Sequence, residues 1–174
     1  MSADRAPQPD KHWLDPANYK EHWASRAEIA MTLLGSANAV CDLGCGAPQT
    51  VRRLLKPGVT YLPADLKAWT PDTEICNLDI AQYPDRALAA CDVCLLLGVL
   101  ERLTVNAGEV FRSLRTRIPR LIFSYHPVDE SGKRYLDWKN AYSNAEIDRF
   151  IAGANWVARP RILLGGGQFL YDLR

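Results

Sequence analysis

The chain has 174 residues, of which 48% are hydrophobic and 24% are charged, and its formal net charge is +1. This length suggests one domain, since domains commonly have about 100–200 residues. The composition is that of a globular protein and excludes a disordered chain or a disulfide-stapled miniprotein. A near-neutral chain has no overall field that attracts nucleic acid or an acidic membrane. Charge therefore favours neither as a partner.

The N-terminal segment is polar and proline-rich and lacks the apolar stretch of a signal peptide. We expect residues 1–12 to be a flexible lead-in and residues 13–174 to form a single domain. The longest strongly apolar run, residues 93–100, is far shorter than a membrane span of about 20 residues. Five cysteines is an odd number, and three of them lie in apolar, strand-like runs, which is typical of reduced thiols in a cytosolic protein. These features predict a cytoplasmic protein.

Strand-like and helix-like segments alternate along the chain, which is the signature of a parallel sheet with helices on its faces. The expected helices span residues 16–34, 48–55, 84–90, 103–114 and 143–153. The expected strands span residues 39–43, 59–64, 74–78, 92–97 and 120–125, and a hairpin of residues 156–164 and 168–173 closes the chain. A long loop, residues 126–142, lies between the fifth strand and the last helix. The pattern predicts an α/β fold with a seven-stranded sheet.

Several helix starts carry recognisable caps. Asp15 is a candidate cap, and Pro16 suits a first helical position. Asn106 is a candidate cap for the main part of the fourth helix. The segment Ser143-Asn-Ala-Glu146 is a capping box, in which the first and last side chains each bind the other's backbone N–H.

The most informative stretch is Val40-Cys-Asp-Leu-Gly-Cys-Gly46, in which a strand runs into two glycines and a helix follows directly. Glycines let the backbone turn tightly and approach a ligand closely. The start of a helix also offers unpaired N–H groups to an electronegative ligand. Alone, this turn indicates no more than a nucleotide-like cofactor.

Three aspartates narrow the choice of cofactor. Asp42 lies two residues before the first glycine, Asp65 at the end of the second strand and Asp79 at the end of the third. An acid in the position of Asp65 can accept hydrogen bonds from ribose hydroxyls. Because these strand ends open onto the same edge of the sheet, a ligand there meets glycine backbone and several acids. Such a lining repels a pyrophosphate and suits a cationic cofactor that carries a ribose.

These residues resemble the motifs of class I S-adenosylmethionine-dependent methyltransferases. The glycine segment resembles the first motif of this family, and Leu62-Pro-Ala-Asp-Leu66 resembles the segment that carries its ribose-binding acid. Asp79-Ile80 resembles the acid and the apolar residue that lie beside the adenine. Leu96-Leu-Gly-Val-Leu-Glu-Arg-Leu103 resembles the fourth-strand motif. The resemblance implies a three-layer, Rossmann-like, seven-stranded and mostly parallel sheet with an antiparallel C-terminal hairpin. It implies S-adenosylmethionine as the cofactor, bound by Asp42, Gly44, Cys45 (through its backbone), Gly46, Asp65, Leu66, Asp79, Ile80 and Gly98.

The chain departs from the family pattern in two respects. Pro48 stands where the third glycine is usual, although proline suits the first turn of a helix. The chain also lacks a large insertion that would form a substrate domain. An NAD-dependent oxidoreductase is the alternative for a glycine turn, but its pattern requires a glycine at position 49, where this chain has Gln49.

His126 is the first candidate for a general base, and Glu101 is the next. His126 follows the fifth strand on the ligand edge and opens the longest loop of the chain, and long loops in compact domains are often functional. A base helps when the methylated atom belongs to a hydroxyl or a protonated amine. The alternative is that His126 only orients the acceptor. We expect the acceptor near Gly98, Glu101, Tyr125 and His126.

No metal site is expected. Cys91-x-x-Cys94 has the spacing of half a zinc or redox site, but residues three apart in a strand point to opposite faces. No second cysteine or histidine pair lies at ligand spacing.

The acceptor is expected to be a small molecule, such as a sugar or a natural-product intermediate. The stretch after the fourth strand lacks the Asn/Asp-Pro-Pro-aromatic motif of enzymes that methylate exocyclic amino groups, and the chain has no Pro-Cys nucleophile. The sequence thus predicts an S-adenosylmethionine-dependent methyltransferase with a small-molecule acceptor. The alternative is a catalytically silent S-adenosylmethionine-binding module that works with a partner protein.

Overall fold

The computed structural model describes residues 15–16, 24–131 and 137–174. The expected lead-in at residues 1–12 lies outside these ranges, as does the segment 17–23 of the first expected helix. Among the described residues, no helix combines the length and the apolar character that crossing a membrane requires.

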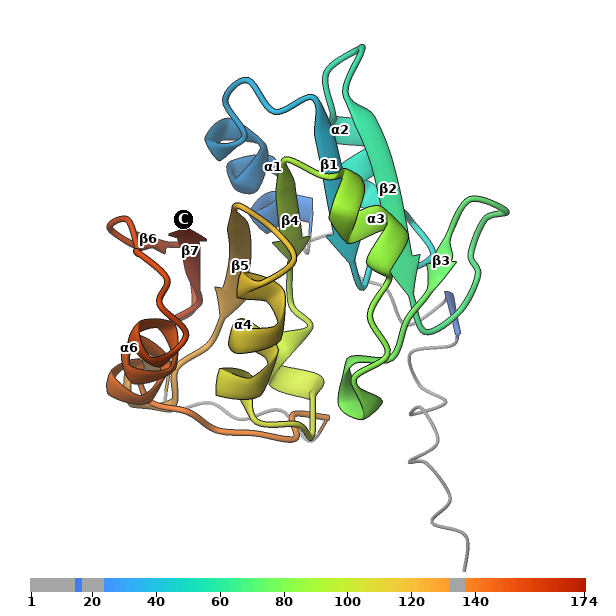
Figure 1. The fold of residues 1–174 in the computed structure, drawn as a ribbon. Helices are drawn as coiled ribbons and strands as arrows, with labels where there is room; N and C mark the ends of the chain where they lie inside the picture. The colour runs from blue at the N-terminus through green and yellow to red at the C-terminus, as the bar shows by residue number, and fades with distance from the viewer. Residues whose placement is uncertain (1–14, 17–23, 132–136) are drawn as a thin grey trace, which may run out of the picture.

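A single seven-stranded sheet forms the centre of the molecule, with the order β3-β2-β1-β4-β5-β7-β6 (Figure 1). Neighbouring strands among the first five pair in parallel, and β7 runs antiparallel to both β5 and β6. This confirms the expected mostly parallel sheet with a closing hairpin. The strands are β1 (Ala39–Leu43), β2 (Thr60–Asp65), β3 (Glu74–Ile75), β4 (Val93–Leu96), β5 (Leu121–Tyr125), β6 (Ile162–Leu163) and β7 (Phe169–Leu173).

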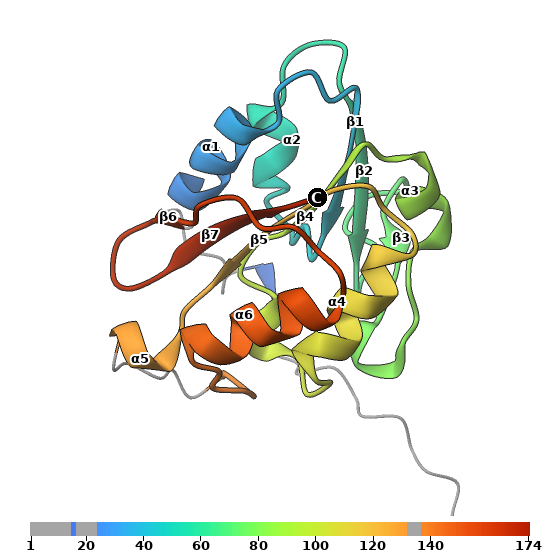
Figure 2. The ribbon, with the colours of Figure 1, turned by 60° about the vertical axis from the view of Figure 1, so that its left-hand side comes forward.

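Helices cover both faces of the sheet and give the fold three layers (Figure 2). One face carries α1 (Ala24–Leu33) and α2 (Thr50–Leu54), and the other carries α3 (Asp85–Ala90), α4 (Ala107–Arg115) and α6 (Asn144–Gly153). Shorter helical turns follow individual strands, namely η4 (Leu78–Ile80), η5 (Leu100–Arg102) and α5 (Val128–Ser131).

Strand β4 shows why the sheet needs both layers. Val93 and Leu95 pack in the core beneath α1 and α2, whereas Cys94 and Leu96 pack in the core beneath α3, α4 and α6. All four side chains are buried. An uninterrupted apolar run is what a parallel strand covered on both faces requires.

Two of the expected caps are present. The Ser143 hydroxyl accepts a hydrogen bond from the Glu146 N–H at 3.3 Å, and the Glu146 carboxylate accepts one from the Ser143 N–H at 2.8 Å. Asn106 caps α4 by accepting a hydrogen bond from the Gly108 N–H at 2.8 Å. Both helices therefore begin directly after their predicted caps, although α4 begins at Ala107 and not at residue 103, where the expected range started.

Three expected boundaries were wrong. Helix α2 begins at Thr50 and not at Pro48, because Gln49 before it adopts the left-handed conformation with φ 43°. Strand β3 ends at Ile75, so Asp79 lies in the turn η4 and not at the strand end. The expected loop at residues 126–142 contains the short helix α5.

All five cysteines are buried and free. Cys91 ends α3 and lies outside any strand, so the expectation that Cys91 and Cys94 point to opposite faces was wrong. Both pack in the same core as Cys41, and Cys94 lies opposite Cys41 in the β1–β4 register. Within the described residues, no group of three histidine, cysteine or acidic side chains is placed to hold a metal ion.

The carboxyl ends of β1, β2, β4 and β5 lie along the same edge of the sheet, the lower edge in Figure 1. Helix α1 is fixed against this sheet at its C-terminal end by Arg120. The Arg120 guanidinium donates to both carboxylate oxygens of Asp172 at 2.7 and 2.9 Å and to the Leu33 carbonyl at 2.6 Å. Arg120 thus ties the C-terminal end of α1 to β7, and at the other end of the helix Arg26 reaches Gly98 near the ligand edge.

Candidate functional site

The glycine turn after β1 is bonded to the end of β2. The N–H groups of Gly44 and Cys45 both donate to the Ala64 carbonyl, at 2.8 and 3.3 Å, and the Gly46 N–H donates to the Asp65 carboxylate at 2.8 Å. These amides are therefore not the open donors that a turn before a helix suggested. Gly44 itself is exposed, and an added Cβ there would overlap the side chain of Val99. The turn needs glycine because the two loops touch.

Asp65 is the buried acid that fixes this turn. One carboxylate oxygen accepts from Gly46, and the other accepts from the Leu66 N–H at 2.6 Å. Burial raises the pKa of Asp65, and these backbone hydrogen bonds act in the opposite direction. Each carboxylate oxygen can accept a second hydrogen bond. The Lys67 N–H and the Trp69 side chain also form hydrogen bonds with this carboxylate, so hydroxyl donors from a ligand would share its acceptor positions with these protein donors.

Asp42 lies within β1 and is buried beside Asp65. Its carboxylate accepts a hydrogen bond from the Tyr61 hydroxyl at 2.8 Å. Burial raises the pKa of Asp42 to about 7, and the negative charge of Asp65 acts in the same direction, whereas Tyr61 and Arg26 act to lower it. A cation bound at this edge would favour the ionised carboxylate.

Asp79 and Ile80 lie on the β3 side of the glycine turn. One Asp79 oxygen accepts hydrogen bonds from the N–H groups of Thr104 and Val105, at 2.6 and 3.1 Å. Asp79 therefore connects η4 to the loop that follows η5. Ile80 is 44% exposed, which is unusual for an isoleucine next to a buried turn. It offers an apolar surface at this end of the edge.

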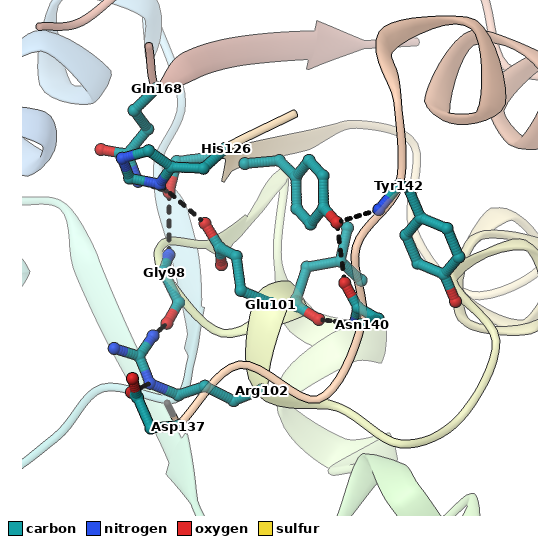
Figure 3. Close-up of polar contacts among 11 residues, drawn as sticks. Gly98, Glu101, Arg102, His126, Asp137, Asn140, Tyr142 and Gln168 are labelled. Carbon is teal, nitrogen blue, oxygen red and sulfur yellow. Dashed lines mark hydrogen bonds and ion pairs between the residues drawn. The ribbon is translucent and has the colours of Figure 1, made fainter. Parts of the chain in front are cut away.

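Gly98, directly after β4, lies at the centre of the second half of the site. Its N–H donates to the buried Ser124 hydroxyl at 2.8 Å, and its carbonyl accepts from the Arg102 guanidinium (Figure 3). The backbone there is left-handed with φ 70°. An added Cβ would overlap the guanidinium group of Arg26, which reaches Gly98 from α1. Glycine is thus required both by conformation and by this contact.

The structure brings the two catalytic candidates together. His126 Nδ1 lies 3.3 Å from Glu101 Oε1 (Figure 3). The His126 ring packs against Trp138, with centroids 4.9 Å apart and the ring planes tilted by 40°. His126 follows β5, and Glu101 lies in η5 after β4. The two adjacent parallel strands therefore place these residues side by side at the ligand edge.

Glu101 is 1% exposed and is held in its charged form. Burial acts to raise its pKa, but the hydrogen bond to His126 and the nearby guanidinium groups of Arg102 and Arg26 outweigh burial and lower it. Because a carboxylate only accepts hydrogen bonds, the ionised Glu101 favours a hydrogen on His126 Nδ1, and in the neutral ring with this tautomer Nε2 is the acceptor. Among the described residues, Glu101 Oε2 has no hydrogen-bond partner.

The segment 137–142 crosses over the β4 exit and is bonded to it. The Tyr125 hydroxyl donates to Asn140 Oδ1 and accepts from the Tyr142 N–H, each at 2.8 Å (Figure 3). The Asn140 amide donates to the carbonyls of Leu100 and Leu103 at 2.7 and 3.0 Å. Tyr125 was expected beside the acceptor, but its hydroxyl is used inside the protein and anchors the segment.

Sequence reasoning missed several residues of this site. Arg26 and Asn140 reach it from separate segments that no local motif marks, and Arg102 lies in the fourth-strand segment Leu96–Leu103 but was given no role there. Gln49 is also unexpected: it is buried, and its amide donates to the Thr70 hydroxyl at 2.8 Å, which ties the glycine turn to the loop after β2. One feature of the sequence could have drawn attention to Gln49: it stands at the position where a nucleotide-binding turn often has glycine.

The solved structures to which this fold is similar include several methyltransferases. The N,N-8-amino-8-demethyl-D-riboflavin dimethyltransferase of Streptomyces davawensis matches 91% of this chain with a TM-score of 0.66 and 17% identity. The magnesium protoporphyrin IX methyltransferase of Synechocystis, solved with bound S-adenosylhomocysteine, matches 98% with a TM-score of 0.64 and 15% identity. The chain has the class I methyltransferase fold. A scan against protein-family models and a search of curated proteins each found no match.

The methyltransferase fold confirms the resemblance drawn from the four sequence motifs. The chain spans 55% of the length of the riboflavin-derivative enzyme and 90% of the magnesium protoporphyrin enzyme. It also covers 77% of the 1,6-didemethyltoxoflavin-N1-methyltransferase of Burkholderia thailandensis, with a TM-score of 0.65 and 17% identity.

Proposed function

We propose that this protein is an S-adenosylmethionine-dependent methyltransferase that acts on a small molecule. The observation that carries the proposal is the Asp65 carboxylate at the end of β2, hydrogen-bonded to the glycine turn of a methyltransferase fold. Ribose hydroxyls would share the acceptor positions of Asp65 with the protein's own donors, and the buried acid Asp42 next to it suits a positively charged ligand.

The residues at the β1–β3 ends fit this cofactor chemically. Gly44 is exposed at the edge, Asp42 and Asp65 supply negative charge, and Ile80 supplies an apolar surface at the opposite end from Gly98. When bound, S-adenosylmethionine supplies a methyl group already activated by its sulfonium. The residues proposed to hold it are Asp42, Gly44, Cys45, Gly46, Asp65, Leu66, Asp79, Ile80 and Gly98.

His126 and Glu101 are proposed as the catalytic residues. With Nδ1–H directed at Glu101, His126 Nε2 can take a proton from the acceptor, and the Glu101 carboxylate stabilises the imidazolium that forms. This arrangement suits an acceptor whose reacting atom carries a removable proton, such as a hydroxyl or a protonated amine. The protein also aligns the two reactants and excludes water, which lowers the barrier further.

A small-molecule acceptor is supported by the neighbouring structures. The enzymes with this fold described above are named for a riboflavin derivative, a magnesium porphyrin and a toxoflavin precursor. In this chain, the wall beside His126 is the buried Trp138. An aromatic wall against the base suits a flat organic acceptor.

The proposal is tested first by mass spectrometry of the purified protein for co-bound S-adenosylmethionine or S-adenosylhomocysteine, and by calorimetry with both compounds. We expect binding of both, and no comparable binding of NADH. Methyl transfer to members of a small-molecule panel then tests catalysis. NADH binding as tight as that of S-adenosylhomocysteine would contradict the proposal, and cofactor binding without turnover on any acceptor would indicate a silent binding module instead.

A further inference from the structure

Arg26 is placed inside the site by a helix that carries none of the recognised motifs. It lies in the first turn of α1, and its guanidinium group rests against the α-carbon of Gly98 at the end of β4, in the space that any side chain at Gly98 would fill. Gly98 is itself fixed by the hydrogen bond from its N–H to Ser124, and Arg120 holds the other end of α1. The position of the guanidinium is therefore determined from both sides.

The charge on Arg26 is maintained in a partly dehydrated place. Burial lowers the pKa of Arg26 to about 10, and Arg102 acts in the same direction, whereas Glu101 and Asp42 act to raise it. Arg26 thus stays protonated at neutral pH. Arg102 binds the Gly98 carbonyl (Figure 3), so two guanidinium groups meet at one glycine. Arginine is the side chain best suited to bind a carboxylate through two parallel hydrogen bonds.

The order of the strands determines which part of a cofactor would come to this point. The inference rests on the proposed function, in which Asp65 at the end of β2 binds the ribose. The exposed Ile80 offers an apolar surface toward β3, which suits an adenine. The remaining, amino-acid part of the molecule then extends the other way, over β1 toward its neighbour β4. Arg26 stands at that end, against Gly98.

We propose that Arg26 binds the α-carboxylate of S-adenosylmethionine, so that α1 completes the cofactor site. The amino-acid end of this molecule carries one carboxylate among positively charged groups. The surroundings of Arg26 can match this distribution, with the guanidinium groups of Arg26 and Arg102 at Gly98 and the carboxyl groups of Asp42 and Glu101 nearby. A guanidinium alone would repel the sulfonium and ammonium, and the two acids offset that repulsion.

The test compares two ligands that differ in the amino-acid part. S-adenosylhomocysteine carries the carboxylate, and 5′-methylthioadenosine lacks the whole amino-acid end. Calorimetry should show that Arg26→Gln weakens S-adenosylhomocysteine binding by about 10- to 150-fold, the range for a lost hydrogen bond to a charged group, and leaves 5′-methylthioadenosine binding unchanged. Arg149→Gln, an exposed position on α6, is the matched control and should change neither affinity.

The outcomes separate this inference from the proposed function. If the wild-type protein binds neither ligand, the proposed function fails and the inference fails with it. If the wild type binds both and Arg26→Gln alters both equally or neither, only the inference is overturned. If Arg26→Gln does not fold, Arg26→Lys provides the same comparison. Lysine keeps the charge but cannot form the two parallel hydrogen bonds of a guanidinium group. This variant should still weaken only S-adenosylhomocysteine binding.

Discussion

The two halves of the ligand edge are built in different ways. At the ends of β1 and β2, the contacts join a strand to its hydrogen-bonded neighbour, as in Gly46–Asp65 and Asp42–Tyr61. At the ends of β4 and β5, the contacts join loops and turns, as in Glu101–His126 and Tyr125–Asn140. In the first half, the contacts involve a strand residue, Asp65 or Asp42, directly. In the second half, the adjacent strands β4 and β5 bring the segments close together, and side chains of the loops and turns beyond the strand ends make the contacts.

This difference separates the two proposed tasks of the site. The half at the ends of β1 and β2, here called the strand-held half, is proposed to bind the part of the cofactor that does not react, and a rigid backbone suits that role. The half at the ends of β4 and β5, here called the loop-held half, contains His126, Glu101 and Arg26. These residues lie where the acceptor and the reacting end of the cofactor are proposed to meet. We therefore expect changes in the first half to alter cofactor affinity and changes in the second half to alter turnover, with Arg26 as the residue that links the two.

The largest effect is expected from His126→Ala. Loss of a general base lowers turnover by about 10²- to 10⁴-fold, while S-adenosylhomocysteine affinity measured by calorimetry should stay nearly unchanged. The measurement is methyl transfer with an acceptor identified in the panel. His126→Asn is the companion variant, because an amide can donate to Glu101 but cannot take a proton at neutral pH.

A smaller loss that appears mainly in the Michaelis constant, and that His126→Asn restores, would assign His126 to orienting the acceptor. Full activity of His126→Ala would remove His126 from the site. Either result would weaken the contrast between the two halves, because the loop-held half would then lack its base.

The next effect concerns Asp42 and the pH dependence of stability. The folded pKa of about 7 lies above the ordinary value of 3.8, so between these values the folded protein binds a proton that the unfolded chain does not. The free energy of unfolding should then fall as pH rises from about 4 to 7, by up to about 1.4 kcal/mol per pH unit. Asp42→Asn cannot ionise and should show a shallower decline in urea denaturation at pH 5 and pH 8.

The decline should not vanish in Asp42→Asn, because burial also raises the pKa of Asp65, which both proteins retain. Identical pH dependence in the two proteins would show that Asp42 does not titrate in this range. Added S-adenosylmethionine should favour the ionised form, so wild-type affinity should increase from pH 6 to pH 8 more than that of the variant.

Asp65→Ala should weaken S-adenosylhomocysteine binding by about 1.5–3 kcal/mol, because hydrogen bonds to a charged group contribute about that much. The variant also loses the bond to the Gly46 N–H, so thermal unfolding must be recorded alongside calorimetry. Asp65→Asn keeps an acceptor oxygen for Gly46, but it removes the charge and turns an NH₂ group toward the Leu66 N–H, and it should bind with intermediate affinity. Unchanged affinity in a folded Asp65→Ala protein would refute the ribose assignment.

The sequence predicted the strand-held half because its contacts follow from local patterns. A strand, two glycines and an acid at the end of the next strand occur at spacings that the β1–β2 register imposes, so Asp42, Gly46 and Asp65 meet as expected. The predicted boundaries were wrong where a contact with a distant segment determines the backbone conformation. Gln49 takes a left-handed conformation because its amide is held by Thr70, and α2 starts two residues late as a result.

The loop-held half was predicted only in outline. His126 could be placed at the edge because it directly follows an apolar strand, but its pairing with Glu101 depends on how β4 and β5 neighbour each other. Arg26 had no signal, since an arginine in a helix of low amphipathicity gives no indication of where its guanidinium will lie. Its partner Gly98 is distant in the sequence, and only the packing of α1 on the sheet brings them together.

The smallest effect is expected from Tyr125→Phe, which tests whether one hydroxyl holds the loop-held half together. Removing it leaves Asn140 Oδ1 and the Tyr142 N–H without their 2.8 Å partner, and it should lower the free energy of unfolding by about 1–2 kcal/mol. Tyr142→Phe is the matched control, because the Tyr142 hydroxyl makes only a 3.4 Å contact with the Ala107 N–H, and its cost should be smaller. If segment 137–142 depends on this anchor, Tyr125→Phe should also raise the Michaelis constant for the acceptor and leave S-adenosylhomocysteine affinity unaltered. Equal losses of stability in the two variants, or a loss of cofactor affinity in Tyr125→Phe, would show that the two halves are not held independently.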